Sequence, residues 1–358
     1  VVACPHALGL AVPLVVSIST TLSARNGLLV RQRTALESAK DLNIVVFDKT
    51  GTLTEGKQGV TGLTTDSLSE HEAIRLAAGL EADSEHPIAE AVRAYAQARD
   101  ITPATVQEFN SIAGRGVQGV VDGVTYWVGG PRLLEHLGVT LPTTLSAAQS
   151  AAHQAGQAVI YLTDSQRVMA VFTIADSIRP ESSAAIRDLR AMQIEVVMMT
   201  GDNEAVAKNV AAQLGISRYF AQVLPEHKAD YIGQLKRDGA KVAMVGDGIN
   251  DAPALASADV GIAIGAGTDV AIESAGIVLV RSNPQDIVKI VRLSRATYRK
   301  MIQNLWWATG YNVLAIPVAM GVLAPWGITL DPAVGAALMS LSTIIVAANA
   351  QWLRRTQL

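Results

Sequence analysis

Apolar segments at both ends of the chain enclose a middle in which short apolar runs alternate with helical patterns. Residues 1–24 are mostly apolar or small and are interrupted by Pro5 and Pro13, and two further apolar segments lie at 303–323 and 333–353. Each segment has about the 20 residues needed to cross a bilayer. The pattern therefore predicts three membrane helices around a soluble α/β portion.

Within the soluble portion, apolar runs separated by helical patterns predict a parallel, doubly wound sheet. The runs cover Val168 to Ile174, Val196 to Met199, Val242 to Val245, Val260 to Ile264 and Ile277 to Val280. Ile44 to Phe47 is expected in the same sheet, despite the long insertion that follows it. We assign 25–57 and 167–290 to this domain.

The insertion, residues 58–166, carries its own helix and strand signals and is predicted to be a separate α/β module with hinges near Gln58 and Gln166. Helical patterns cover Glu70 to Leu80 and Ile88 to Arg99, and Pro87 suits a first helical turn. Short strand-like pieces follow at Gly116 to Val121, Thr125 to Val128 and Ala158 to Thr163.

Composition supports a membrane protein with a soluble portion. The chain has 358 residues, 49% hydrophobic and 17% charged, and its net charge of -3 excludes a strongly basic nucleic-acid binder. Basic clusters follow the first apolar segment, precede the second and follow the third, which puts the soluble portion on the cytoplasmic side. The chain opens inside an apolar run without the features of a signal peptide, so we expect it to be part of a longer protein.

Asp48 directly follows the apolar run Ile44 to Phe47 and opens a turn rich in Gly and Thr. Open α/β sheets place their chemistry at this end of a strand, where a carboxylate can act as a nucleophile toward a phosphoryl group, with Lys49 available for charge. A lone Asp in this position is more often a helix cap. The whole run Asp48-Lys49-Thr50-Gly51-Thr52-Leu53-Thr54, however, resembles the phosphorylation motif of the P-type ATPases.

Cys4 and His6 flank Pro5 in the first apolar segment. Proline frees a helix carbonyl, a defect tolerated in a membrane where it lines a site. The trio resembles the Cys-Pro-His signature of one class of heavy-metal-transporting P-type ATPases, and the resemblance implies that Cys4 and His6 bind the transported ion. The last two apolar segments resemble those of copper pumps, which adds four residues to this site: Tyr311, Asn312, Met339 and Ser342.

Polar and glycine residues of the insertion match the nucleotide-binding domain of heavy-metal pumps in type and order. They are Glu81, Ser84-Glu85-His86-Pro87, Gly114-Arg115-Gly116 and Gly129. The resemblance implies that Glu81 and His86 meet the adenine of ATP and that the glycines let the backbone approach it. Taken alone, His86 is equally explained as a helix cap.

Two further loops, Thr200-Gly201-Asp202 and Gly246 to Asp251, bring polar groups to the strand ends where Asp48 is expected. Carboxylates there suit Mg²⁺, which binds few protein carboxylates together with phosphate oxygens and waters. The resemblance to a haloacid dehalogenase-like phosphorylation domain implies a Mg²⁺ site at Asp48, Asp247 and the carbonyl of Thr50. It assigns Thr200 and Lys228 to the phosphoryl group and puts Asn250 and Asp251 in support. Gly201 and Asp202, which follow Thr200 in the same loop, are also expected among the catalytic residues.

Together these motifs cover nearly the whole chain and imply a haloacid dehalogenase-like phosphorylation domain with an inserted nucleotide-binding domain, flanked by transmembrane helices. The implied function is ATP-driven export of copper through an aspartyl phosphate. The implied partners are the bilayer and a metal-delivery protein, and the implied location is the bacterial cytoplasmic membrane. A thiolate and a thioether favour Cu⁺ over Cu²⁺. The absence of Asp, Glu and Lys from 305–323 and 333–353 counts against zinc.

Three alternatives remain open from the sequence. The first is a pump for Ag⁺ or Zn²⁺. The second is a membrane-tethered phosphatase of the dehalogenase-like superfamily, although such enzymes usually have a second Asp where this chain has Thr50. The third is a non-catalytic remnant, against which the intact Asp48, Lys228 and Asp247 argue. We also expect the actuator domain and earlier helices of the family to lie outside these residues, so that the chain autophosphorylates without completing a transport cycle.

Overall fold

The computed structural model describes residues 6–237, 239–265, 269–327, 331–356 and 358. The chain divides into two compact units. The first comprises 1–47, 184–196 and 225–358, and the second comprises 48–183 and 197–224. Two separate sheets, one of seven strands and one of six, organise the soluble portion.

The seven-stranded sheet has the order β1-β13-β12-β11-β2-β9-β10. Its strands are β1 (Leu28–Val30), β2 (Ile44–Asp48), β9 (Glu195–Met199), β10 (Arg218–Phe220), β11 (Val242–Gly246), β12 (Val260–Ile264) and β13 (Ile277–Leu279). The central strands β2, β11 and β12 are buried throughout and pair in parallel, whereas β1 runs antiparallel to β13. Strands covered on both faces need continuous apolar runs, which is why the sequence predicted them correctly.

Helices connect the strands of this sheet. They are α3 (Arg33–Ser38), α8 (Ser182–Ala191), α9 (Glu204–Leu214), α10 (Lys228–Lys236), α11 (Ala252–Ser257) and α12 (Asp269–Ser274), with the short turns η1 (Ala39–Asp41), η3 (Pro225–His227) and η4 (Ile249–Asp251). Local chemistry sets the ends of α9, because the Asn203 side chain accepts from the Val206 N–H and Gly215 closes the helix at φ +68°.

The six-stranded sheet has the order β3-β8-β7-β6-β5-β4 and is antiparallel at every pairing. Its strands are β3 (Thr54–Thr65), β4 (Gln107–Ile112), β5 (Gly116–Val121), β6 (Val124–Gly129), β7 (Ala158–Thr163) and β8 (Val168–Ile178). Its helices are α4 (Glu70–Leu80), α5 (Pro87–Gln97), α6 (Pro131–Leu137) and α7 (Thr143–Gln154). One apolar core joins α4 and α5 to β5, β7 and β8.

The position of β8 corrects one prediction. The apolar run from Val168 was expected in the parallel sheet, but it pairs antiparallel with β3 and β7. A buried strand has the same apolar run whichever sheet it joins, so the sequence alone did not distinguish the two. The strand β3 is mostly polar and was not predicted. Together β3 and β8 extend the second sheet across the predicted hinges near Gln58 and Gln166.

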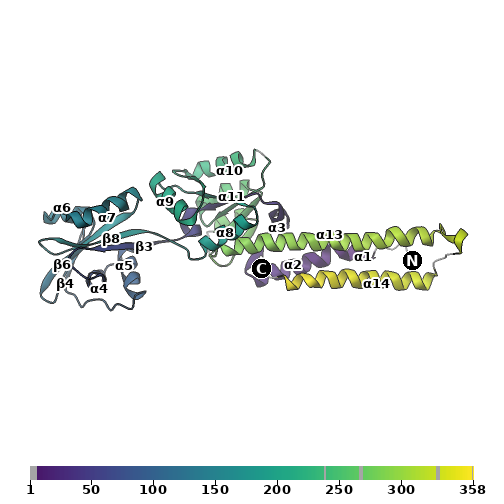
Figure 1. The fold of residues 1–358 in the computed structure, drawn as a ribbon, viewed down its shortest axis with the longest axis horizontal. Coiled ribbons are helices and arrows are strands. Elements are labelled where there is room, and N and C mark those ends of the chain that lie inside the picture. Colours follow the sequence, from purple (N-terminus) through teal and green to yellow (C-terminus); the bar gives the residue numbers. More distant parts are fainter. Residues whose placement is uncertain (1–5, 238, 266–268, 328–330, 357) are drawn as a thin grey trace. The chain divides into compact units, whose positions relative to one another are not determined.

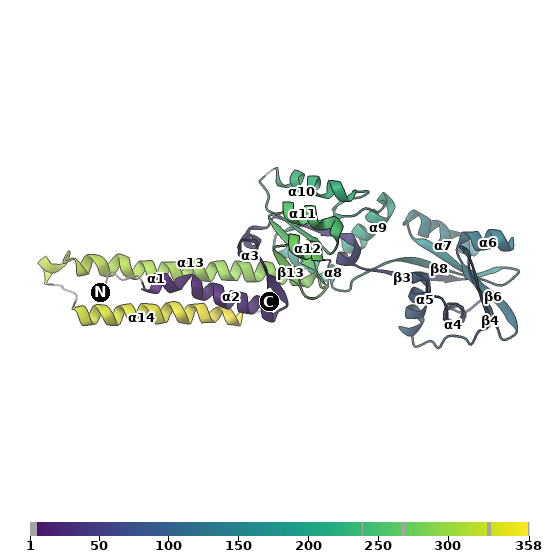
Figure 2. The same cartoon turned by 180° about the vertical axis from the view of Figure 1, so that it is seen from behind.

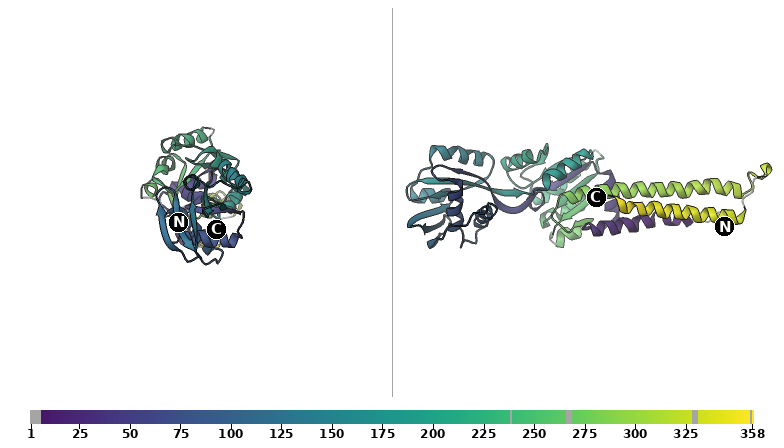
Figure 3. Two further views of the ribbon diagram at one scale, coloured as in Figure 1. Left: turned by 90° about the vertical axis from the view of Figure 1, so that its left-hand side faces the viewer. Right: turned by 60° about the horizontal axis from the view of Figure 1, so that its bottom comes forward.

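In the first unit, α1 (His6–Ala11) and α2 (Pro13–Arg25) follow one another alongside α13 (Gln285–Ala319) and α14 (Pro332–Gln351), as Figures 1 and 2 show. The turns η5 (Ala324–Trp326) and η6 (Trp352–Arg355) follow α13 and α14. Pro13 is the first residue of α2, and the helix is interrupted between Ala11 and Pro13. The right-hand view of Figure 3 shows these helices from a further direction.

Length and hydropathy mark one helix in the described part of the chain, Pro332–Arg355, as able to cross a membrane. The apolar stretch Gly9–Arg25 is shorter. The predicted segment 303–323 lies mainly in α13. This helix is long enough to span a bilayer, but its polar residues keep it from being marked as a candidate span. The first and second predicted spans therefore remain predictions.

Candidate functional site

The nucleophile candidate Asp48 is the last residue of β2 and is buried. After it, Lys49–Leu53 forms one wide turn, η2, closed by a hydrogen bond from the Thr54 N–H to the Lys49 carbonyl. Gly51 adopts φ +73° within this turn, a conformation that a side chain disfavours. Gly51 therefore allows the backbone to reverse its direction after β2.

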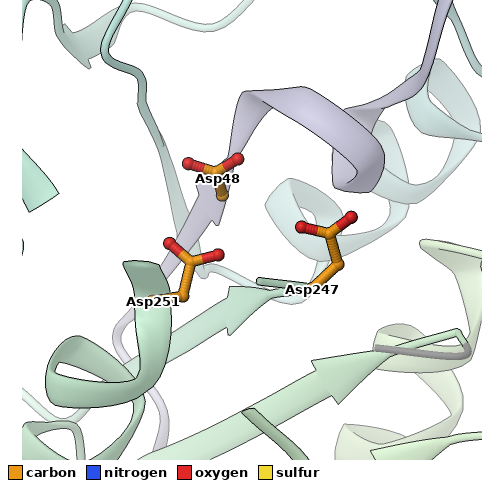
Figure 4. Close-up of side chains that lie close together, drawn as sticks. All are labelled: Asp48, Asp247 and Asp251. Atoms are coloured by element: carbon orange, nitrogen blue, oxygen red, sulfur yellow. The ribbon is translucent and has the colours of Figure 1, made fainter. Parts of the chain in front are cut away.

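Three carboxylates lie together at the ends of adjacent strands. Asp48 ends β2, Asp247 follows β11, and Asp251 lies in η4 (Figure 4). One oxygen from each lies within 4.8 Å of the others. Three oxygen donors this close suit a hard divalent cation such as Mg²⁺. The parallel pairing of Phe47 with Val245 brings Asp48 and Asp247 to the same edge of the sheet, as predicted.

Lys228 joins this cluster through Asp251. Its Nζ lies 2.6 Å from Asp251 Oδ1, and both side chains are almost fully buried. The second Asp251 oxygen accepts from the Gly248 N–H at 3.3 Å. Asp247 is partly buried, whereas Asn250 and Thr50 are exposed. Of the predicted supporting pair, Asp251 is thus at the centre of the cluster and Asn250 is at its surface.

Lys49 is held by two carboxylates. Its buried Nζ lies 2.8 Å from Asp202 and 3.4 Å from Asp176. Thr200 is buried just after β9, and its hydroxyl accepts from the Asp202 N–H at 3.1 Å. Gly201 lies between them in the same turn. The three predicted residues of this loop therefore form one polar turn, which contacts the phosphorylation motif through Lys49.

Sequence reasoning missed Arg179 and Ser182, whose side chains donate hydrogen bonds to the turn after Asp48. Arg179 donates from Nη2 to the Gly51 carbonyl at 2.9 Å and from Nε to the Thr52 carbonyl at 3.2 Å. Ser182 donates to the Leu53 carbonyl at 2.7 Å. The only signal in the sequence was a charged cluster after an apolar strand, and its contacts to a turn more than 120 residues away depend on the tertiary fold.

The predicted nucleotide residues line one cavity in the second unit. Glu81, His86, Gly114, Gly116 and Gly129 all border a space of about 300 Å³. Burial raises the pKa of the Glu81 carboxyl, against smaller lowering effects of Ser84 and Arg93. The Glu81 carboxyl is therefore easier to protonate than the carboxyl of a surface Glu.

His86 has the role of a helix cap as well as a place in the cavity. Its Nδ1 accepts from the Ile88 N–H at 3.2 Å at the start of α5, which leaves Nε2 to carry the proton in the neutral ring. The glycines also have a structural reason. Gly116 pairs with Gly129 across β5 and β6, and a Cβ on either would lie 2.1 Å from a backbone oxygen of the facing segment.

The candidate ion residues are described in part. Cys4 lies outside the described residues, as do the side chains of His6 and Tyr311. Asn312 is partly buried on α13, and Met339 and Ser342 lie one turn apart on α14. Ser342 Oγ is buried and has no hydrogen-bond partner in the described part of the chain.

A layer of small apolar contacts fixes where these residues lie along the helices. Ala7, Ala308 and Val346 belong to one buried cluster that joins α1, α13 and α14. Asn312 is four residues after Ala308, and Ser342 is four residues before Val346. Because α14 runs opposite to α13, both lie one turn beyond this layer on the side where α1 begins.

Comparison with known proteins agrees with this geometry. A family model for haloacid dehalogenase-like hydrolases matches residues 42–259, which include both strands of the carboxylate cluster and the inserted module. The chain belongs to the haloacid dehalogenase-like hydrolases. The predicted fold class is thereby confirmed, with Asp48 in the strand-end position that this fold uses for its chemistry.

Within this family, the curated relatives are metal pumps. Over 99% of its length the chain is 54% identical to a copper-exporting P-type ATPase B of Archaeoglobus fulgidus, and it is 45% identical to a protein of the same name from Enterococcus hirae. The chain spans about half the length of these relatives, 51% and 47% respectively. The predicted resemblance to heavy-metal P-type ATPases is confirmed.

Solved structures of the same class share the fold. A zinc-transporting PIB-type ATPase matches 98% of this chain with a TM-score of 0.85 and 32% identity, and the match covers 56% of that chain. The catalytic domain of a CPx-ATPase, studied for conformational changes upon nucleotide binding, matches 76% of this chain with a TM-score of 0.52 and 29% identity, and the match covers 98% of that domain. This dehalogenase-like chain therefore shares its fold with transport ATPases.

Proposed function

We propose that this chain is the catalytic and carboxyl-terminal membrane portion of an ATP-driven copper exporter, and that Asp48 is the residue phosphorylated by ATP. The observation that carries the proposal is the carboxylate cluster at the strand ends, with Asp48 opening the turn that Lys49 and Arg179 hold. Similarity to copper-exporting P-type ATPases over 99% of the chain supports the same reaction.

The phosphoryl step follows from the residues at this edge. A carboxylate oxygen of Asp48 attacks the γ-phosphorus, the bond from that phosphorus to the β,γ-bridging oxygen breaks, and ADP leaves with the electron pair. Asp48, Asp247 and Asp251 would hold Mg²⁺, which supplies neutralisation of phosphate charge when bound. The ammonium group of Lys49 is oriented by its ion pairs with Asp202 and Asp176.

Thr50 favours a phosphoenzyme that persists over one that is hydrolysed at once. Related phosphatases usually have an Asp two positions after the nucleophile, which acts as general acid and base. A threonine hydroxyl at that position does not supply this proton transfer at neutral pH. This feature supports a pump over a tethered phosphatase, because transport requires an intermediate that lasts through a conformational change.

The adenine of ATP is proposed to bind in the cavity of the second unit. Its volume of about 300 Å³ lies at the lower end of the usual range for small-molecule pockets. Glu81 and the Nε2–H of His86 supply polar groups suited to a base edge, and Ile88 and Ile160 supply apolar walls.

Copper is the proposed ion on two grounds. Curated relatives that are 45 to 54% identical are named as copper exporters, whereas the zinc-transporting structures are 32% identical. Cys4 and Met339 offer soft sulfur ligands that suit Cu⁺. The buried hydroxyl of Ser342 has no hydrogen-bond partner in the described part of the chain, and Ser342 and Asn312 lie one turn beyond the layer of Ala7, Ala308 and Val346, on the side where α1 begins.

Location and partners follow from the same proposal. The similarity is to membrane P-type ATPases, and the candidate span Pro332–Arg355 ends at Arg354 and Arg355. The positive-inside rule then puts the ATP-using units in the cytoplasm. We further propose a bacterial cytoplasmic membrane as the location and a soluble metal-delivery protein as the donor of copper.

Acid-stable labelling from γ-labelled ATP tests the proposal. The chain should incorporate label in the presence of Mg²⁺, and Asp48→Asn should incorporate none, because the amide keeps the shape of the nucleophile without its charge. In the longer protein, completed with the amino-terminal half of a copper-exporting relative, Cu⁺ should stimulate turnover of the label, and Cys4→Ser should abolish that stimulation. Label in Asp48→Asn, or stimulation by Zn²⁺ alone, would contradict the proposal.

A further inference from the structure

Polar side chains recur along one face of α13. Ser294, Thr297, Lys300 and Asn304 are spaced by three or four residues, which puts them on one face of a helix. Ser294 donates to the Leu36 carbonyl, and Thr297 Oγ1 donates to Ser19 Oγ on α2 at 3.0 Å. The face continues through Lys300 to Asn304, which lies at the start of the predicted segment 303–323.

Lys300, Asn349 and Asn304 form a continuous hydrogen-bonded chain. Lys300 Nζ donates to Asn349 Oδ1 at 2.8 Å, Asn349 Nδ2 donates to Asn304 Oδ1 at 2.8 Å, and Asn304 Nδ2 donates to the Ala11 carbonyl at 3.1 Å. An ammonium group has only donors and a carbonyl has only acceptors. Because Lys300 can only donate and the Ala11 carbonyl can only accept, these two groups fix the orientation of the Asn349 and Asn304 amides between them.

The acceptor of this chain lies at a break in the helical backbone. Ala11 is the last residue of α1, and α2 begins at Pro13. Asn304 is completely buried, where an amide without a hydrogen-bond partner would be costly. The side chain therefore ties the interruption between α1 and α2 to the middle of α13.

The amino-terminal part of α13 packs within the first unit, which contains most of the seven-stranded sheet. Ile287 and Val291 are fully buried there, and Arg295 donates to the Lys40 carbonyl at 3.2 Å. One unbroken helix therefore connects that packing to Asn304. From Asn304 to Asn312 is eight residues, or about 12 Å along the helix, so the hydrogen-bonded chain lies about two turns from the candidate ion residues.

We propose that Asn304 and Asn349, closed by Lys300, are positioning residues that transmit movement of α13 to the segment carrying Cys4 and His6. The inference rests on the proposed function, since it assigns these residues to coupling between Asp48 and the ion site. They touch neither ATP nor the ion. Their role is to make α1 and α14 follow α13 when the phosphorylation state changes.

The single cysteine of the chain, Cys4, provides the test. The rate at which a membrane-permeant maleimide modifies Cys4 is measured in membranes containing the full chain, with and without beryllium fluoride and Mg²⁺ as the aspartyl phosphate analogue. Asn349→Asp keeps the acceptor for Lys300 and nearly the same volume, but it cannot donate to Asn304. Asn349→Leu is a second variant, and Ser340→Ala is the control because that exposed hydroxyl bonds within α14, to the Ala336 carbonyl.

In the parent chain the analogue should change the modification rate. Both Asn349 variants should still take label from ATP, but the ratio of the two rates should move toward one by about three- to tenfold, the scale of one hydrogen bond between membrane helices. Ser340→Ala should behave as the parent chain.

An unchanged ratio in both Asn349 variants, or no effect of the analogue in the parent chain, would overturn the inference. Loss of ATP labelling in both variants would also overturn it, because the residues would then be needed for the fold. Failure of the parent chain to take label from ATP would instead reject the proposed function.

Discussion

Single side chains determine how the turn after Asp48 is held. Lys49 is buried between Asp176 and Asp202, and Thr54 donates to the Lys49 carbonyl at 2.9 Å and contacts Asp176. Arg179 reaches two further carbonyls of the turn. A backbone fixed in this way would keep Asp48, the proposed nucleophile, aligned without rearrangement during the proposed phosphoryl transfer.

Arg179→Ala should slow phosphorylation by ATP by about tenfold or more. Hydrogen bonds to a charged group contribute roughly 1.5–3 kcal/mol, and two carbonyls of the turn would lose their donor. Rapid-quench labelling with a saturating ATP concentration measures the rate. Arg187→Ala is the control, since Arg187 is 76% exposed and pairs with its neighbour Asp188 at 3.6 Å. Equal rates for both variants would show that the turn holds its shape without Arg179.

The raised pKa of Glu81 makes local stability depend on pH. Burial favours the neutral carboxyl, so the folded state binds this proton more tightly than the unfolded state. Between the ordinary Glu pKa of 4.5 and the raised value, the folded state therefore holds more protons, and stability falls as pH rises. Hydrogen exchange of buried amides in β5 and β7 should show this decline, and Glu81→Gln should remove it. An identical pH dependence in the variant would assign the decline to another group.

Among the elements, α5 combines a structural start with a candidate binding group. The cap at His86 stabilises the helix, and the same ring borders the cavity. The paired glycines of β5 and β6 show a similar overlap, because contact between the strands already excludes a side chain. A glycine or histidine at these positions is therefore explained in part before any ligand is considered.

Replacement of His86 should separate these two contributions. His86→Asn keeps a good capping side chain and should retain stability, but it removes the imidazole and should weaken ATP binding by about tenfold. His86→Ala should lose the affinity and also about 1 kcal/mol of stability. Calorimetric titration and thermal melts measure the two effects. Ser69→Ala, which removes the cap of α4 at 3.2 Å from the Glu72 N–H, should reduce stability alone. Unchanged ATP affinity in His86→Asn would remove His86 from the site.

For the molecule as a whole, nucleotide binding and phosphoryl transfer should be separable. The proposed adenine cavity is lined by the second unit, whereas Asp247 belongs to the first. Asp247→Asn should lower Mg²⁺-dependent labelling by roughly a hundredfold, because the metal loses a carboxylate ligand, while ATP affinity without Mg²⁺ stays within about twofold. Filter labelling and calorimetry on the same preparation measure both. Loss of both activities in a folded variant would argue against this division.

The sequence by itself determined the features that depend on local pattern. Continuous apolar runs specified β2, β11 and β12, because strands buried on both faces need them. Pro87 and the helical period specified α5 to within a few residues. The phosphorylation motif and the Gly246 to Asp251 loop were recognised because their residue types follow directly on such strands.

The tertiary structure decided what depends on distant partners. The sheet to which β8 belongs, the grip of Arg179 on Gly51 and the chain from Lys300 to Ala11 all join residues far apart in sequence. The polar strand β3 forms because β8 offers its edge, and nothing in its own pattern demands a strand. Local periodicity shows which face of an element is buried. Which partner buries that face is set by how the whole chain packs, and the pattern of a single sequence does not show which elements pair.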